Sequence, residues 1–213
     1  MAFTGGRDQT LVQYDLKGKK VQHSYGEVHD DTITAICGGQ GGVDEVLITG
    51  SKKTLKIWKI VLEMDSEKNV AHYSNVYVTL AKEFENAHEN FIRSIAITPC
   101  GGFAFSAGED KSLKKWDMNL KCLDADFGTG EEIGDCKSGD VFSVDVSPCG
   151  AYVFTGGSSK SLNQWDVAGG GLKSSVAGIH EDWVLCVKFS CLGSFVFTAG
   201  KDRKLKQWEI LDK

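Results

Sequence analysis

The segment Gly108–Asp117, GEDKSLKKWD, decides the fold because its spacing recurs along the chain. It contains a glycine that is followed five positions later by leucine and eight positions later by an aromatic residue. The five copies are Gly6/Leu11/Tyr14, Gly50/Leu55/Trp58, Gly108/Leu113/Trp116, Gly157/Leu162/Trp165 and Gly200/Leu205/Trp208. A motif that returns roughly every 50 residues is typical of a repeat architecture and not of one irregular domain.

Short strand patterns surround this motif in each copy. In the third copy, residues 92–97, 103–106 and 113–116 are predicted strands, and a fourth is expected within 120–127. Turns are predicted between these strands, at 99–102 and 108–111. Short strands at this spacing predict an all-β protein, and the strict repetition favours a propeller over a sandwich or barrel. The copies cover approximately 1–26, 27–85, 86–128, 129–176 and 177–213 of a single domain.

Composition is consistent with an intracellular globular protein. The 213 residues include 25 glycines and two prolines, and the formal net charge is −5. No apolar run approaches the roughly 20 residues that cross a bilayer, and the first residues lack the pattern of a signal peptide. Seven cysteines without a Cys-x-x-Cys motif favour free thiols over disulfides or zinc. We expect a cytoplasmic protein without a metal or membrane segment, although a nuclear location stays open.

The third and fifth copies resemble the WD-repeat (G-beta-like) family. The matching His, Ser/Thr, Asp and Trp positions are His88, Ser106, Asp110 and Trp116, and His180, Thr198, Asp202 and Trp208. The resemblance implies that each repeat forms a four-stranded blade, in which these four side chains make a structural hydrogen-bond network. A buried indole N–H, imidazole and carboxylate each need a partner, and such a network supplies them. The four recurring tryptophans are therefore expected to be buried.

The remaining copies depart from this pattern. The second copy has Lys52 at the aspartate position, and its Thr49 is displaced by one residue. The fourth copy has Ser159 at the aspartate position and Lys137 near the histidine position, and the first has Tyr14 for tryptophan. We therefore expect the complete network only in the third and fifth blades.

The first and last copies are both predicted to be incomplete. The segment Ala2–Gly6 matches the second strand of the fifth copy, so the first blade is expected to lack its initial strand. The last blade is expected to lack its final strand. Since WD-type rings have about seven blades, the sequence predicts part of a larger ring. A truncated gene product is the favoured explanation, and an array completed by another chain and a compact five-blade ring are alternatives.

Two segments are longer than the minimum repeat. Residues 63–83 enlarge the connection between the third and fourth strands of the second copy. Residues 124–140 are rich in Asp and Glu. Insertions in repeat proteins usually form surface loops. The acidic segment is expected to be either a solvated loop or a contact for a basic partner.

Catalytic signatures are missing from the sequence. His88-Glu89 and His180-Glu181 begin like a zinc-protease motif, but Ile92 and Val184 stand where the second histidine would be. No nucleophile-elbow or phosphate-binding loop motif occurs, and the recurring histidines are explained by the blade network. We therefore expect no enzyme activity and no cofactor.

The remaining candidate function is binding of another protein. In the WD-repeat family, partners commonly contact residues just after the histidine and beside the turn aspartate. The candidate partner-binding residues at these positions are Phe91, Arg93, Glu109, Phe142, Trp183, Leu185 and Lys201. Trp183 stands out because it is the one tryptophan outside the repeated position, although packing against a neighbouring loop would also explain it. Aromatic residues and arginine are frequent in interface hot spots.

The sequence thus predicts a non-enzymatic scaffold or adaptor that binds a protein or peptide. The alternative is a nucleic-acid-associated or ribosome-associated propeller. It is suggested by lysines and an arginine near the third strands, at Lys52, Lys53, Lys56, Lys111, Lys114, Lys115, Lys201, Arg203, Lys204 and Lys206. The negative net charge makes nucleic acid the weaker alternative.

Overall fold

The computed structural model describes residues 1–41, 44–64, 73–118, 122–126 and 139–210, and all of its regular elements are strands. They form five antiparallel sheets. The first sheet contains β1 (Ala2–Gly5), β2 (Leu11–Asp15) and β3 (Lys20–Tyr25), and the second contains β4 (Ala35–Gly41), β5 (Asp44–Gly50), β6 (Leu55–Met64) and β7 (Tyr73–Phe84). The third contains β8 (Ile92–Ile97), β9 (Phe103–Gly108), β10 (Leu113–Asp117) and β11 (Cys122–Asp126). The fourth contains β12 (Val141–Val146), β13 (Tyr152–Gly157), β14 (Leu162–Asp166) and β15 (Leu172–Val176), and the fifth β16 (Val184–Phe189), β17 (Phe195–Gly200) and β18 (Leu205–Glu209).

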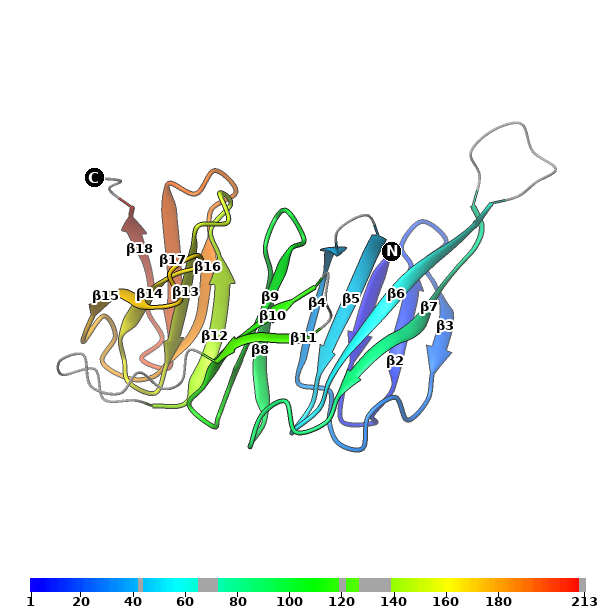
Figure 1. Cartoon of the computed structure of the whole chain (residues 1–213), viewed down its shortest axis with the longest axis horizontal. Coiled ribbons are helices and arrows are strands. Elements are labelled where there is room, and N and C mark those ends of the chain that lie inside the picture. The colour runs from blue at the N-terminus through cyan, green and yellow to red at the C-terminus, as the bar shows by residue number, and fades with distance from the viewer. Residues whose placement is uncertain (42–43, 65–72, 119–121, 127–138, 211–213) are drawn as a thin grey trace.

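The sheets stand side by side as the blades of an open propeller. Neighbouring sheets meet through their inner strands, since β4 contacts β8, β8 contacts β12 and β12 contacts β16. Figure 1 shows the first and fifth sheets at opposite ends of the row, so the five sheets do not close a ring. The first sheet has no strand equivalent to β4, and the fifth has no described strand beyond β18. The predicted all-β fold with five blades, of which two are incomplete, is confirmed.

The recurring leucine and tryptophan build the core between neighbouring sheets. Third-strand leucines point toward the following sheet, and third-strand tryptophans point toward the preceding one. Between the second and third sheets, for example, Leu55 and Trp116 belong to one buried cluster with Ile92 and Ile95. Each such side chain contributes about 1.5 to 3 kcal/mol on burial. The repeat in the sequence is therefore a repeat of inter-sheet contacts.

The fifth sheet departs from this pattern at both recurring positions. Trp58, Trp116 and Trp165 are buried, whereas Trp208 is only half-buried, so the expectation of burial was wrong for that residue. No described strand covers it beyond β18. Leu205 is 74% exposed because no sheet among the described residues packs on its face of the fifth sheet, whereas the four equivalent leucines are at most 6% exposed.

The recurring glycine leaves room for a neighbouring element and is not needed for an unusual backbone angle. A Cβ atom at Gly157 would lie 1.9 Å from the Asp140 carbonyl oxygen, and one at Gly200 would lie 2.5 Å from the His180 ring. The left-handed residue of the turn comes three positions later, at Lys111, Lys160 and Arg203, with φ between 62° and 65°. In the third, fourth and fifth sheets, the glycine therefore lets the loop before the first strand pack tightly on the turn, whereas a Cβ at Gly50 would meet Ile92 of the next sheet.

The predicted strands of the third copy are confirmed within one or two residues, but residues 63–83 differ from the predicted loop. Much of this segment continues β6 and β7 as a long antiparallel hairpin, paired from Leu55↔Phe84 to Met64↔Tyr73. Figure 1 shows the hairpin projecting beyond the other strands. Two hydrogen bonds join β7 to the first sheet: the Gln13 side-chain amide donates to the Val76 carbonyl, and the Val78 amide donates to the Tyr25 hydroxyl. Most of the acidic segment 124–140, including Lys137, lies outside the described residues.

Candidate functional site

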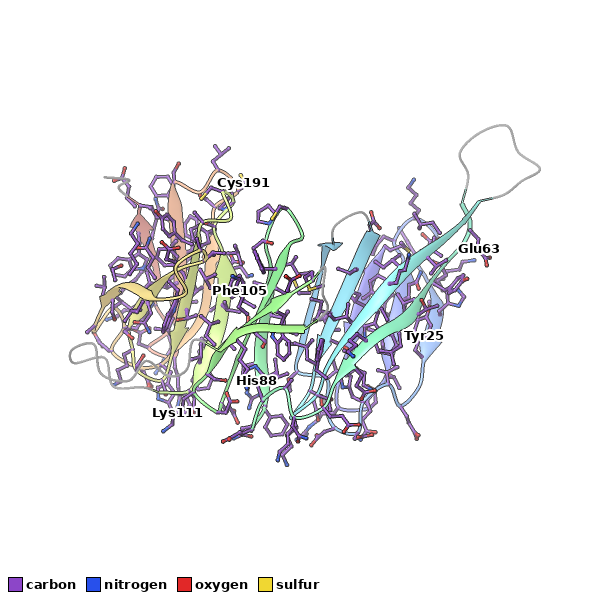
Figure 2. The ribbon with its side chains drawn as sticks, viewed as in Figure 1. Tyr25, Glu63, His88, Phe105, Lys111 and Cys191 are labelled. Carbon is purple, nitrogen blue, oxygen red and sulfur yellow. The ribbon has the colours of Figure 1, made fainter. Side chains whose placement is uncertain are left out.

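The loop before each first strand and the turn between the second and third strands lie along the same edge of the sheets, which we call the loop face. It is the lower edge in Figure 2, where His88 and Lys111 are labelled, and Cys191 marks the opposite edge. Backbone hydrogen bonds join loop and turn: the Glu109 amide donates to the Phe91 carbonyl and the Lys201 amide to the Trp183 carbonyl, at 2.9 and 2.8 Å. These bonds fix the candidate binding residues against the blade scaffold.

A hydrogen-bond network lies directly beneath the loop face in the third sheet. His88 Nδ1 lies 2.9 and 3.0 Å from the two Asp110 carboxylate oxygens, and Nε2 lies 2.6 Å from Ser106 Oγ. Trp116 donates its indole N–H to the same Ser106 oxygen at 2.9 Å. Because a carboxylate only accepts hydrogen bonds, His88 Nδ1 carries a proton and donates a hydrogen bond to Asp110. The network thus joins the turn, two strands and the loop.

The fifth sheet repeats this arrangement. His180 Nδ1 contacts Asp202 at 2.9 Å, and Thr198 Oγ1 lies 2.8 Å from His180 Nε2 and accepts the Trp208 N–H at 2.9 Å. Burial alone would raise the pKa of Asp202, but hydrogen bonds from the Glu181 amide and His180 lower it to about 2. The pKa of Asp110 is likewise held well below its usual range, mainly by His88, against the opposing effect of burial.

The second sheet contains a version of the network without a carboxylate. His29 lies 2.7 Å from Thr49 Oγ1 and 2.8 Å from Thr54 Oγ1. Burial, with a smaller effect of the Lys56 charge, lowers the pKa of His29 to about 4. Thr49 pairs with Lys56, and Ser106 pairs with Lys114 at the equivalent position of the third sheet. The turn between the second and third strands is therefore one residue shorter in the second sheet, which explains the displacement of Thr49 in the sequence.

Sequence reasoning missed the hydroxyl groups that precede the third-strand leucine. Ser112 Oγ lies 2.9 Å from His88 Nδ1 and donates to Asp110 at 2.7 Å. In the fourth sheet, Ser161 contacts Ser159 at 2.7 Å. The signal was available, because the residue before the leucine is Ser or Thr in four of the five copies: Thr10, Thr54, Ser112 and Ser161.

The Phe91 group comprises Lys52, Phe91, Arg93 and Glu109 on the loop face of the second and third sheets. The Arg93 guanidinium lies 5.3 Å from the centre of the Phe91 ring, and the Lys52 ammonium lies 5.6 Å from it. Arg93 Nε also donates to the Glu109 carboxylate at 2.8 Å. Lys52 comes from the neighbouring sheet, which the sequence alone did not associate with Phe91.

The Trp183 group comprises Phe142, Trp183 and Lys201 on the fourth and fifth sheets. The rings of Phe142 and Trp183 are 5.4 Å apart, and Lys201 Nζ lies 4.2 Å from the indole centre. Trp183 still exposes 40% of its surface, and Leu185 on β16 exposes 48%. The structure therefore brings six of the seven candidate residues into two groups. For the seventh, Leu185, no contact with either group is described.

Most of the basic residues near the third strands have partners within the chain. Lys56 pairs with Glu83, and Lys204 pairs with Glu181. Lys115 is buried, donates to the Val167 carbonyl at 3.2 Å and lies 3.9 Å from the centre of the Phe103 ring. In the described part of the chain, no His, Cys, Asp and Glu cluster could hold a metal ion, and no helix is long and apolar enough to span a membrane.

The comparison with protein families identifies the repeats directly. The family described as "WD domain, G-beta repeat" matches residues 79–117, 131–166 and 175–209, which together make up more than half of the chain. The protein therefore belongs to the WD-repeat family. The first two blades, which depart most from the motif, lie almost entirely outside the matched ranges.

Several curated relatives are WD-repeat or interaction proteins by name. The chain is similar to cross-pathway control WD-repeat protein 2 of Flammulina velutipes, with 28% identity over 93 residues, or 44% of this chain. It is also similar to p21-activated protein kinase-interacting protein 1-like of Xenopus laevis and of Gallus gallus, with 30% and 29% identity over 115 residues, or 54% of this chain. The matched segment spans 26% of the length of each relative.

Proposed function

We propose that this protein is a non-catalytic scaffold whose loop face binds a protein or peptide partner. The observation that carries the proposal is the Trp183 group, in which a large aromatic side chain stays 40% exposed directly before β16. Trp183 is fixed by its backbone bond to Lys201 and by ring contact with Phe142. A rigid, partly exposed tryptophan loses little conformational entropy on binding and can bury a large apolar area.

The Phe91 group supports the same proposal at a second position on the loop face. The positive charges of Lys52 and Arg93 both lie within 5.6 Å of the centre of the Phe91 ring, an arrangement that offers both apolar and charged contacts. The histidines and aspartates beneath the face bond to each other and to the scaffold, which leaves them little part in catalysis. The names of the kinase-interacting relatives also favour a protein partner.

The test is the double variant Phe91→Ala and Trp183→Ala, used as bait in affinity capture with quantitative mass spectrometry. The matched control is Leu16→Ala with Leu192→Ala, because these exposed apolar residues lie in turns at the opposite edge. We expect the loop-face variant to lose partners that the parent and the control retain. Equal capture by all three proteins, with equal melting temperatures, would rule out this face.

Nucleic-acid binding is the alternative, and the pairing of Lys56, Lys115 and Lys204 within the chain makes it weaker. Phosphate contacts are strongly salt-dependent. We therefore expect no retention on immobilised RNA or DNA at low salt, and retention that falls steeply with added salt would favour the alternative.

A further inference from the structure

The turn between β5 and β6 differs in charge from the equivalent turns of the third and fifth sheets. In those two sheets the turn holds an aspartate, which bonds to the histidine beneath it. In the second sheet the Thr54 hydroxyl takes this place, 2.8 Å from His29 Nδ1, and Lys52 stands at the aspartate position. The second turn therefore presents an exposed ammonium group where the other two sheets have a carboxylate.

This turn is held against the loop that precedes the third sheet. The Ile92 amide donates a hydrogen bond to the Ser51 carbonyl at 2.9 Å, directly before Lys52 in the chain. The Lys52 ammonium lies 5.6 Å from the centre of the Phe91 ring, which belongs to that loop. The contact between the two sheets thus places the backbone of Lys52 beside the ring.

The Phe91 group has more positive than negative charge. Arg93 donates from both Nε and Nη2 to one Glu109 carboxylate oxygen, so this pair is neutral as a whole. Lys52 has no ion-pair partner among the described residues. Glu89 is exposed on the same loop as Phe91, but no contact between Glu89 and Lys52 is described. One positive charge beside the ring is therefore uncompensated.

The exposure of the Phe91 group does not come from an end of the row of sheets. The second and third sheets each contain four described strands, and each has a neighbouring sheet on both sides. The Arg93 side chain is nevertheless 39% exposed. Its bonds to Glu109 use only part of the guanidinium, which has further N–H groups to donate. A group that arrives from solvent can therefore reach both Lys52 and Arg93.

We propose that the partner of the loop face is a polypeptide segment with an aspartate or glutamate whose carboxylate contacts Lys52 and Arg93, while an adjacent apolar side chain packs on Phe91. The inference rests on the scaffold function proposed above and names the chemistry of its partner. A single carboxylate matches the single uncompensated charge. A polyanion such as nucleic acid fits less well, because the whole chain has a net charge of −5. Charge complementarity of this kind selects the partner and speeds its association.

Glu109 has two effects in this arrangement. Its carboxylate holds the Arg93 guanidinium, which lies 5.3 Å from the centre of the Phe91 ring, and it also competes with the partner for that guanidinium. Glutamine at this position keeps a hydrogen-bond acceptor of similar shape but removes the competing charge. The substitution Glu109→Gln should therefore strengthen the binding of an acidic segment, whereas a merely disruptive change would weaken it.

The probe is a phage-displayed library of random peptides, selected on the whole immobilised protein. Peptides that bind the parent but not the Phe91→Ala and Trp183→Ala variant are defined as loop-face peptides. We expect Asp and Glu to be enriched among them relative to the unselected library. The most frequent loop-face peptide is then synthesised with a fluorescein label, and its affinity is measured by fluorescence anisotropy.

Two charge variants of the protein should change this affinity in opposite directions. Lys52→Glu should weaken binding by about tenfold or more, because it brings like charges together. Glu109→Gln should strengthen binding by about two- to fivefold, the range of one exposed ion pair. The matched control Lys17→Glu makes the same charge change in the exposed turn between β2 and β3, at the opposite edge, and should leave the affinity unchanged.

The proposal and the scaffold function can fail separately. Loop-face peptides without acidic enrichment, or with equal affinity for the parent, Lys52→Glu and Glu109→Gln, would overturn the carboxylate site and leave the scaffold function standing. If no selected peptide depends on Phe91 or Trp183, both are overturned. If Lys52→Glu does not fold, as judged by circular dichroism, the peptide with Asn and Gln in place of its acidic residues decides the outcome on the parent protein.

Other occupants of the site give distinct results, each of which would overturn the proposal. Tighter binding of single-stranded DNA than of the peptide, lost in Lys52→Glu, would indicate nucleic acid. The acidic segment of this chain is tested by the variant Glu131→Gln, Glu132→Gln and Asp135→Asn. If this variant binds the peptide better by about tenfold or more, an intramolecular competitor has been removed and the segment itself is the occupant.

Discussion

The hydrogen-bond partner at Nδ1 distinguishes His29 from the other two buried histidines. His88 and His180 each have an aspartate partner, while His29 has two threonine hydroxyls. A carboxylate can only accept a hydrogen bond from the ring, whereas a hydroxyl can accept one or donate one. The same position in the repeat thus has different electrostatics in the second blade.

The aspartates of the complete networks should be important for stability. We expect Asp110→Ala and Asp202→Ala each to lower the free energy of unfolding by about 1 to 3 kcal/mol, because a buried imidazole loses its acceptor. The control is Ser159→Ala at the equivalent position of the fourth blade, where we expect a change of at most about 0.5 kcal/mol. Urea unfolding at pH 7 measures all three, and equal values for the aspartate variants and the parent would contradict the network.

The neutral environment of His29 should make stability pH-dependent. Its pKa in the folded protein is lowered from 6.5 to about 4, so the unfolded chain binds a proton that the folded chain does not bind between these values. The stabilisation is full above pH 6.5 and decreases as the pH falls toward 4. From pH 7.5 to 5, we expect the parent to lose about 1 to 2 kcal/mol more than His29→Gln does. Urea unfolding of both proteins across this range tests the expectation, and parallel pH profiles would contradict it.

At the scale of elements, the recurring glycine has no side chain and so allows the loop before the first strand to lie close to the turn between the second and third strands. A side chain at Gly157 would collide with the Asp140 backbone, whereas a Cβ at Gly26 would have no atom within 4 Å. We expect Gly157→Ala to destabilise the protein by about 1 to 3 kcal/mol, as other overpacked sites do. Gly26→Ala should change stability by less than about 0.5 kcal/mol. Thermal melting of the two variants provides the comparison, and equal effects would mean that close approach is not the reason for the glycine.

The elements also show which features a sequence could predict. Strand positions in the third copy, the missing inner strand of the first blade and the missing outer strand of the last followed from the repeat, because each copy could be aligned with the others. The hairpin of β6 and β7 did not, since residues 63–83 have no counterpart in the other copies to indicate pairing. The two groups on the loop face were only partly predictable, because Lys52 approaches Phe91 across a sheet boundary.

At the scale of the whole molecule, repeated contacts account for most of the polar and aromatic residues. The tryptophans of the third strands, the turn aspartates and the histidines bond or pack within and between blades. The residues that the repeat leaves unexplained are on the loop face. They form two groups of aromatic and charged side chains in contact with one another.

The most direct test of the central claim is site-specific photo-crosslinking at position 183. A photoreactive benzoylphenylalanine replaces Trp183 in one protein and Leu192, at the opposite edge, in another, and each is irradiated in cells. If the loop face binds a partner, a discrete protein adduct forms at position 183 and not at 192. Adducts that are the same at both positions, or missing at 183 while the variant folds normally, would contradict the proposed binding face.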